Sequence, residues 1–205
     1  MTRYGLISDI HANLDALLCA FTVLEKSAVD TIYHLGDVAG SRNNPTLTIN
    51  ALIENEVEGV MGNHDLLELC YPSEPLSDPA KEYLARLPQT IEKDGLLFIH
   101  ENPLENVKFG HGYWIKGSYI RNGEDAKRVF EGTTVRIMIV GHTHLASAFS
   151  NASEEHFFRE DGKIQLDPKK RYILNPGSVG KPRDDCTASL GILDTDEQSF
   201  EVIRF

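Results

Sequence analysis

The amino-terminal part of the chain alternates between apolar runs and helix-like segments, and this alternation constrains the fold more than any other feature. Residues 4–8, 31–35 and 57–61 have the composition and length of buried strands. Helical segments are predicted between them, from about 14 to 24 and from 45 to 54. A repeated strand–helix–strand order is typical of α/β proteins, and we expect that class here.

Each of these three strands is followed by polar residues that are capable of chemistry. Asp9 and His11 follow the first strand, Asp37 follows the second, and Asn63 and His64 follow the third. In open α/β sheets, binding sites form outside the carboxyl ends of the strands. Three such ends carrying Asp, His and Asn therefore predict one functional site.

A Gly141-His142-Thr143-His144 motif comes after the apolar run 135–140, which is rich in β-branched residues and predicts a buried strand. In an extended backbone, residues i and i+2 point to the same side, so we expect both imidazoles to converge on one site. The Asp-x-His pair after the first strand has the same spacing. Neutral imidazole is the commonest metal ligand near neutral pH.

Two Asp-Gly pairs predict hairpins in the second half of the chain. Asp94-Gly95 has the residues of a two-residue type I′ turn and precedes the strand that leads to His100. Asp161-Gly162 predicts another hairpin in the same way. Short helices are expected near 81–87 and 124–130. Further strands are expected at 90–93, 96–99, 145–150, 156–160, 163–166, 171–174, 188–194 and 200–205. We expect one domain over residues 1–205.

The net charge of the chain limits which binding partners are expected. Twenty Lys+Arg against 31 Asp+Glu give a formal net charge of -11. Because long nucleic acids are held by basic surfaces, we expect no such partner. A small anionic substrate is compatible if bound cations reverse the local field.

The lengths of the apolar runs and the spacing of the cysteines indicate the cellular compartment of the protein. The sequence has no signal-peptide pattern and no run near the ~18–20 apolar residues of a membrane span, so we expect no membrane partner and a cytoplasmic location. The cysteines at 19, 70 and 186 are odd in number and far apart, and we expect reduced, mostly buried thiols.

The ordered polar motifs carry a family resemblance. They are Asp9-x-His11, Gly36-Asp37, Gly62-Asn63-His64-Asp65, His100 and Gly141-His142-Thr143-His144. This order closely resembles the calcineurin-like metallophosphoesterase superfamily. With the Asn175–Gly180 turn and the closing strands, the chain looks like the superfamily's small bacterial and archaeal phosphodiesterase branch. The resemblance implies a four-layer αββα sandwich, in which two mixed β-sheets are flanked by helices.

The resemblance also implies a binuclear metal centre. Its ligands would be Asp9, His11 and His144 for the first ion, Asn63, His100 and His142 for the second, and Asp37 as a bridge between them. Imidazole, carboxylate and amide ligands without thiolate favour first-row transition metals. We expect two divalent ions, Mn²⁺ foremost, with Fe, Zn, Ni or Co as alternatives. Such a centre carries net positive charge and would attract a phosphate ester into an acidic protein.

The activity that the resemblance implies is hydrolysis of a small phosphodiester. A hydroxide bridging the metals would attack phosphorus while His64 stabilises or protonates the leaving group. A phosphomonoesterase or dinucleoside-polyphosphate hydrolase with the same centre is the alternative, and a non-catalytic metal-binding scaffold is a further one. A protein phosphatase is disfavoured, because Gly40 and Ser41 stand where that class has Asp and Arg.

Other polar residues have simpler interpretations. We expect His34 to be a hydrogen-bonded core residue, and His156 and Arg183 to lie at the surface. A contact between Arg183 and a phosphate is the alternative for that residue. Asp65 would either hold its loop or orient His64. The Asn175–Gly180 turn is expected to support the site, since Pro and Gly restrict its backbone.

The segment after His100 departs from the family pattern. Glu101 and Asn102 stand where the branch usually has glycine and a small polar residue, and this places a carboxylate near the second metal. Residues 101–121 predict a long functional loop. We expect Trp114 to cover the leaving group of the substrate, and packing between the loop and the sheet is the alternative. A contact between His111 and substrate is an open alternative.

Overall fold

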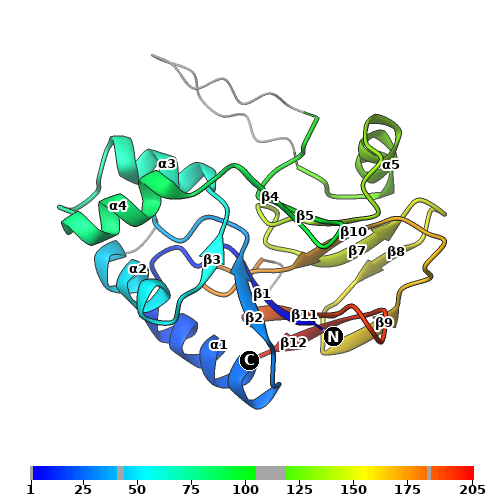
Figure 1. The fold of residues 1–205 in the computed structure, drawn as a ribbon, viewed down its shortest axis with the longest axis horizontal. Helices are drawn as coiled ribbons and strands as arrows, with labels where there is room; N and C mark the ends of the chain where they lie inside the picture. Colours follow the sequence, from blue (N-terminus) through cyan, green and yellow to red (C-terminus); the bar gives the residue numbers. More distant parts are fainter. Residues whose placement is uncertain (1, 41–43, 105–118, 184–185) are drawn as a thin grey trace.

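The computed structural model describes residues 2–40, 44–104, 119–183 and 186–205. It contains two six-stranded sheets that pack face to face (Figure 1). The order in the first sheet is β3 (Glu58–Gly59), β2 (Thr31–His34), β1 (Arg3–Ile7), β11 (Ser189–Asp194), β12 (Ser199–Arg204) and β9 (Gly162–Gln165). The order in the second is β4 (Thr90–Lys93), β5 (Leu96–Ile99), β6 (Ile137–Ile139), β10 (Tyr172–Pro176), β7 (Ala146–Ser150) and β8 (Glu155–Phe157).

Both sheets are mixed. In the first, β1 is parallel to β2 and antiparallel to β11. In the second, β10 is parallel to β6 and antiparallel to β7. The parallel trio β1–β2–β3 and the parallel strands β5, β6 and β10 supply the strand ends after which most of the polar motifs occur.

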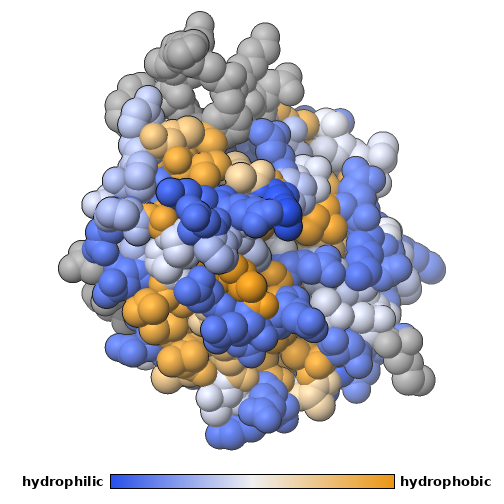
Figure 2. Space-filling view, turned by 60° about the vertical axis from the view of Figure 1, so that its left-hand side comes forward, coloured by the Kyte–Doolittle hydropathy of each residue, from blue (hydrophilic) through white to orange (hydrophobic). Residues whose placement is uncertain are grey.

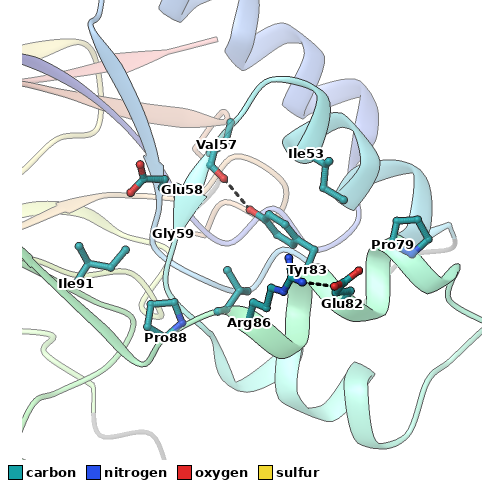
Figure 3. A pocket seen from close by; sticks show the side chains of 11 residues that line it. Ile53, Val57, Glu58, Gly59, Pro79, Glu82, Tyr83, Arg86, Pro88 and Ile91 are labelled. Carbon is teal, nitrogen blue, oxygen red and sulfur yellow. Dashed lines mark hydrogen bonds and ion pairs between the residues drawn. The ribbon is translucent and has the colours of Figure 1, made fainter.

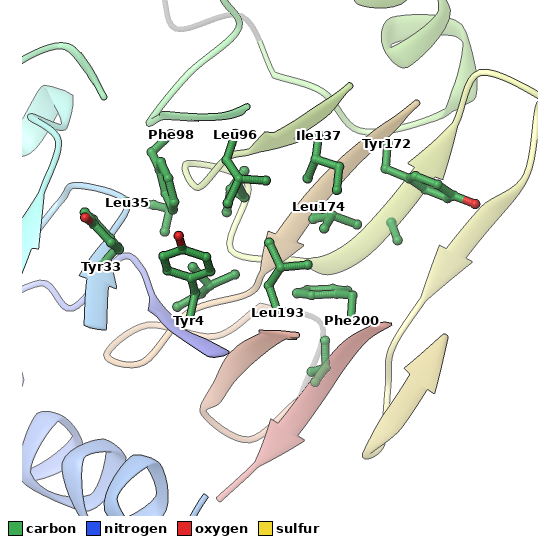
Figure 4. Close-up of a cluster of buried hydrophobic side chains, with 14 of the residues drawn as sticks. Tyr4, Tyr33, Leu35, Leu96, Phe98, Ile137, Tyr172, Leu174, Leu193 and Phe200 are labelled. Atoms are coloured by element: carbon green, nitrogen blue, oxygen red, sulfur yellow. The ribbon is translucent and has the colours of Figure 1, made fainter. Parts of the chain in front are cut away.

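Apolar side chains from both sheets fill the space between them (Figure 4). Along β1, Tyr4 and Leu6 point into this core, whereas Ile7 faces the helices, as strand alternation requires. The rings of Tyr33 and Phe98 stack across the two sheets with centroids 4.5 Å apart. The core therefore holds the two sheets in contact next to the strand ends that carry the polar motifs.

Helices cover the two outer faces. The helices α1 (Leu14–Lys26), α2 (Pro45–Glu54) and α4 (Asp78–Arg86) pack on the first sheet. The helix α5 (Gly123–Gly132) packs on the second. This arrangement confirms the four-layer αββα sandwich. The helix α3 (Asn63–Cys70) packs beside α4, and the sequence analysis did not predict it.

Local sequence explains several boundaries. The Asn13 side chain accepts a hydrogen bond from the Ala16 amide at 3.3 Å and begins α1. Pro45 occupies the first position of α2, where its missing N–H is not needed. Asp94 and Gly95 have φ angles of 52° and 77°, which confirms the type I′ hairpin between β4 and β5.

The prediction of a hairpin at Asp161-Gly162 is wrong. The strand before it, β8, pairs with β7 in the second sheet, whereas β9 pairs with β12 in the first. Neither residue has the positive φ that a type I′ turn requires. The Asp161 carboxylate instead accepts a hydrogen bond from the Arg204 amide at 2.7 Å. The chain crosses between the sheets at this point.

The prediction of mostly buried cysteines is also wrong. The thiols are free, Cys19 and Cys70 are exposed, and Cys186 is half-buried. Cys19 is on the outward side of α1, and Cys70 is the last residue of α3.

Hydrophobic residues occur in small separate patches on the face shown in Figure 2. Among the described residues, no helix is long and apolar enough to cross a membrane.

Candidate metal centre

The predicted ligands come together at one end of the sandwich. Asp9 and His11 follow β1, Asp37 follows β2, and Asn63 begins α3 just after β3. The remaining three come from the second sheet and are His100 after β5 and His142 and His144 after β6. The carboxyl ends of parallel strands from two sheets thus meet at one place.

Four of these side chains form the first ligand group. The ligand atoms of Asp9, His11, Asp37 and His144 all lie within 4.8 Å of one another, and all four residues are buried. The Nε2 atom of His144 is 3.2 Å from Asp9 Oδ1 and 3.3 Å from His11 Nε2. This separation allows one ion to contact all of them.

The second ligand group shares Asp37 with the first and adds His100 and His142. Asp37 Oδ1 is 3.4 Å from His100 Nε2, whereas Asp37 Oδ2 is 3.8 Å from His11 Nε2. The Asn63 amide oxygen is 3.2 Å from His100 Nε2. The two oxygens of one carboxylate therefore face two different groups.

Hydrogen bonds at the far side of two rings fix their tautomers. His100 Nδ1 donates to the Leu35 carbonyl and His144 Nδ1 donates to the Lys181 carbonyl, each at 2.5 Å. A carbonyl can only accept, so in neutral rings the Nε2 lone pairs point toward the ligand groups. His142 Nε2 and Asp9 Oδ1 are buried without a hydrogen-bond partner among the described residues. Converging acceptors without donors fit a bound cation.

The pKa values of His11, His142 and Asp37 agree with this fit, whereas His100 must lose a proton. Burial lowers the pKa of both His11 and His142 to about 4, so these rings are neutral at pH 7. Burial raises the pKa of Asp37, but the neighbouring histidines outweigh it and the net pKa is lowered. Burial opposes the charge on His100, yet Asp37 raises its pKa to about 10. A metal ion would displace that proton.

The backbone at these residues differs from the expected extended conformation. The φ angles are 51° at Asp9, 50° at His11, 53° at Asp37, 66° at His142 and 61° at His144. His142 and His144 still reach one site, as expected, but each belongs to a different ligand group. The reason is a turn at the end of β6, in which the Thr143 amide donates to the Gly141 carbonyl at 2.8 Å.

The Asn175–Gly180 turn supports the ligand loops, as expected. The Asn175 side-chain amide donates to the Gly141 carbonyl at 2.8 Å. The Ser178 hydroxyl and the Gly180 amide both donate to the Asp9 carbonyl, at 2.8 and 3.1 Å. The turn thus connects the loop after β1 with the loop after β6.

His64 lies beside the ligand groups but belongs to neither. It is half-buried in the first turn of α3, and its ring meets the His11 ring edge-on with centroids 4.8 Å apart. Its backbone amide donates to Asp37 Oδ1 at 2.8 Å. Gly40, at φ 85°, passes so close that a Cβ there would lie 2.8 Å from His64 Nδ1. The loop after β2 therefore limits where this imidazole can move.

Asp65 holds the loops and does not orient His64. Its two carboxylate oxygens accept hydrogen bonds from the Ala39 and Gly62 amides, both at 2.9 Å. Burial and the nearby Asp37 charge raise the pKa of Asp65 to about 7. The structure thus decides between the two roles that the sequence left open.

His34 is a buried core residue, as expected. Its Nδ1 accepts from the Gly36 amide at 3.2 Å, so its Nε2 donates to the Tyr83 hydroxyl at 2.9 Å. That hydroxyl donates in turn to the Val57 carbonyl at 3.0 Å (Figure 3). Tyr83 also lines a groove of about 530 Å³ between β3 and α4, and none of the predicted ligands lines this groove.

The other residues singled out from the sequence lie outside the two ligand groups or outside the described part of the chain. His156 and Arg183 are exposed, as expected. Glu101 and Asn102 are half-buried at the end of β5, and the Asn102 side chain accepts from the Leu104 amide at 3.0 Å. The predictions for His111 and Trp114 fall outside the described residues.

The structure adds a residue that sequence analysis missed. The Tyr119 ring stacks on the His142 imidazole, with 4.3 Å between centroids and 19° between planes. Tyr119 belongs to a segment without helical or strand periodicity and is 23 positions from His142 in the chain. No local pattern could reveal that contact.

The fold and the site define a class of protein: an αββα sandwich with a candidate two-metal site at the carboxyl ends of its strands. Residues 2–198 match the family model of the calcineurin-like phosphoesterase superfamily domain. The chain belongs to this superfamily.

Comparison with known proteins agrees with this assignment. The chain is 28% identical to the uncharacterized protein MJ0912 of Methanocaldococcus jannaschii, with 98% of this chain and 86% of that protein covered. A metallophosphoesterase from Sphaerobacter thermophilus has a similar structure, with a TM-score of 0.82, 28% identity and coverage of 99% and 87%. A structure described as a novel archaeal phosphodiesterase shares the fold, with a TM-score of 0.59, 18% identity and 99% of both chains covered.

Proposed function

We propose that this protein is a binuclear metal-dependent phosphoesterase that hydrolyses a small phosphodiester in the cytoplasm. The observation that carries the proposal is the position of Asp37, whose two carboxylate oxygens face two separate groups of histidines. One shared carboxylate between two ligand groups is the arrangement that a two-metal site needs. Membership of a phosphoesterase superfamily supports phosphate esters as the substrates.

Two divalent cations, when bound, supply Lewis-acid activation of water and neutralise charge on the phosphoryl oxygens. The side chains that would hold them are the seven predicted ligands, Asp9, His11, Asp37, Asn63, His100, His142 and His144. Their nitrogen and oxygen donors favour Mn²⁺ and other first-row transition metals over Mg²⁺.

His64 is assigned to the leaving group. It is half-exposed beside the ligand groups and contacts the edge of His11 without joining the set. From that position its imidazole can donate a proton to the departing oxygen, a contribution of about 10²–10⁴ in rate. His64→Gln should therefore lose most turnover while both metal ions still bind, as measured by kcat and by metal content after gel filtration. Loss of one metal equivalent would make His64 a ligand instead.

Phosphomonoester or dinucleoside-polyphosphate hydrolysis by the same centre is the second candidate. A non-catalytic scaffold is a third, and the placement of His64 next to complete ligand groups argues against it.

The first test is metal removal. Protein treated with a chelator should lose activity, and Mn²⁺ should restore it better than Mg²⁺ because histidine ligands prefer later first-row metals. Rates on bis(p-nitrophenyl) phosphate and on p-nitrophenyl phosphate would separate diester from monoester preference. Full activity in protein that elemental analysis shows to be metal-free would reject the proposal.

A further inference from the structure

Two arginines gather around the tyrosine that covers His142. The guanidinium carbon of Arg121 lies 3.9 Å from the centroid of the Tyr119 ring, and that of Arg183 lies 6.0 Å from it. Contacts between guanidinium groups and aromatic faces are favourable. Tyr119 therefore places two positive charges at the edge of the second ligand group.

The stack fixes the position of Arg121. The His142 imidazole and the Arg121 guanidinium are each too close to the Tyr119 ring to share one of its faces. They therefore lie on opposite faces, and the ring separates a predicted metal ligand from a cation.

Arg183 reaches the same place from another part of the chain. It follows the Asn175–Gly180 turn, and two residues before it the Lys181 carbonyl accepts a hydrogen bond from His144 Nδ1. Both arginines are thus connected to the loop after β6, Arg121 through His142 and Arg183 through His144. The cluster is built from segments about 60 residues apart.

Among the described residues, neither guanidinium forms an ion pair or a side-chain hydrogen bond. Two other arginines are engaged: Arg171 donates to two carbonyls and the Thr133 hydroxyl, and Arg128 is paired with Asp125 at 3.8 Å. Each guanidinium offers five donors. Both guanidinium carbons lie within 6.0 Å of the centroid of one ring, so an anion beside that ring would be attracted by both charges.

We propose that Arg121 and Arg183 form an anion subsite beside the two ligand groups, and that it binds a second phosphate group of the substrate. This inference rests on the proposed function and names its substrate class: a phosphodiester or phosphoanhydride that carries at least one further phosphate. Guanidinium matches phosphate oxygens in a bidentate geometry, which makes arginine suited to this role.

The test compares two matched diesters, thymidine 5′-(p-nitrophenyl phosphate) with and without a 3′-phosphate, on the Mn²⁺-loaded protein. The wild-type protein should prefer the 3′-phosphorylated substrate. Because a hydrogen bond to a charged group contributes about tenfold or more, Arg121→Gln and Arg183→Gln should each reduce kcat/KM for that substrate by about tenfold. The loss on the other substrate should be smaller. Arg128→Gln, which removes the same charge from the exposed face of α5, should leave both rates unchanged.

Equal losses on both substrates, or a double variant that keeps the wild-type preference, would overturn the subsite. A binding measurement separates this failure from failure of the proposed function. In the Mn²⁺-loaded His64→Gln protein, calorimetry should show thymidine 3′,5′-bisphosphate binding more tightly than thymidine 5′-monophosphate, and the double arginine substitution should abolish the difference. If the wild-type protein hydrolyses neither diester, the proposed function fails. The subsite fails if the binding difference is absent or survives the substitution.

Discussion

The two ligand groups are held in place by different kinds of contact. In the first, Asp9 accepts four hydrogen bonds: its Oδ2 accepts from the Ser8 hydroxyl and the His142 amide, and its carbonyl accepts from Ser178 and Gly180. Each group has one histidine whose Nδ1 donates to a backbone carbonyl, His144 in the first and His100 in the second. In the second, Asn63 is half-buried at a helix start. His142 is held by the face of Tyr119.

The groups differ in their remaining ligands: the first has the hydrogen-bonded Asp9 carboxylate, whereas the second has the neutral Asn63 amide and a histidine positioned by packing. Hydrogen bonds that orient a ligand raise metal affinity, and a carboxylate attracts a cation more strongly than an amide does. The first group should therefore bind its metal more tightly than the second. Substitutions at Asp37 and Tyr119 would test this ranking.

Removing the shared Asp37 carboxylate should weaken metal binding in both groups and abolish the difference between them. Asp37→Asn takes one negative charge from both groups at once, so occupancy of both metals should fall and activity should drop by about 10³-fold or more. Metal content by elemental analysis after dialysis and kcat measured with Mn²⁺ would check this. A variant that keeps two ions per chain would mean that Asp37 does not bridge.

Removing the Tyr119–His142 stack should lower the metal affinity of the second group alone. Tyr119→Leu removes a ring contact worth about 0.5–1.5 kcal/mol, so affinity for the weaker metal should fall by about three- to tenfold. Tyr119→Phe keeps the ring and is the matched control. Stepwise Mn²⁺ titration by calorimetry resolves the two sites. Equal weakening of both sites in the Leu variant would contradict the ranking.

Replacing His34 should change the pH dependence of the free energy of unfolding, and this is the smallest of the three effects. Burial lowers the pKa of His34 to about 3. Its neutral form is therefore favoured in the folded state, so its contribution is complete above pH ~6.5 and declines as pH falls, by about 1.4 kcal/mol per pH unit. Urea unfolding of metal-free protein between pH 5 and 8 should give a shallower decline for His34→Gln. The control is His156→Gln, which changes an exposed histidine. Parallel curves for wild type and His34→Gln would show that His34 titrates normally.

Much of the site could be predicted because its residues follow strands. Asp9, Asp37 and His100 each come directly after an apolar run, and parallel strands bring such residues to one edge. The starts of α1 and α2, expected near residues 14 and 45, and the turn at Asp94-Gly95 depend on neighbours in the chain, and these predictions are confirmed.

The remaining features depend on contacts that the sequence does not display. Asp161-Gly162 has the composition of a hairpin, but tertiary pairing of β9 with β12 overrides it. The helix α3 is only eight residues long and begins inside the polar motif, so it lacks a clear apolar period. The Tyr119–His142 stack joins distant segments.

The left-handed backbone at the ligands has a consequence for protein engineering. Twelve described residues other than glycine have positive φ, and five of them are predicted ligands: Asp9, His11, Asp37, His142 and His144. This conformation costs about 1–2 kcal/mol per residue. A procedure that selected residues for stability alone would place glycine or asparagine at these positions and erase the site. Read in reverse, the same backbone angles, without any reference to side-chain chemistry, would direct a search for function to this end of the sandwich.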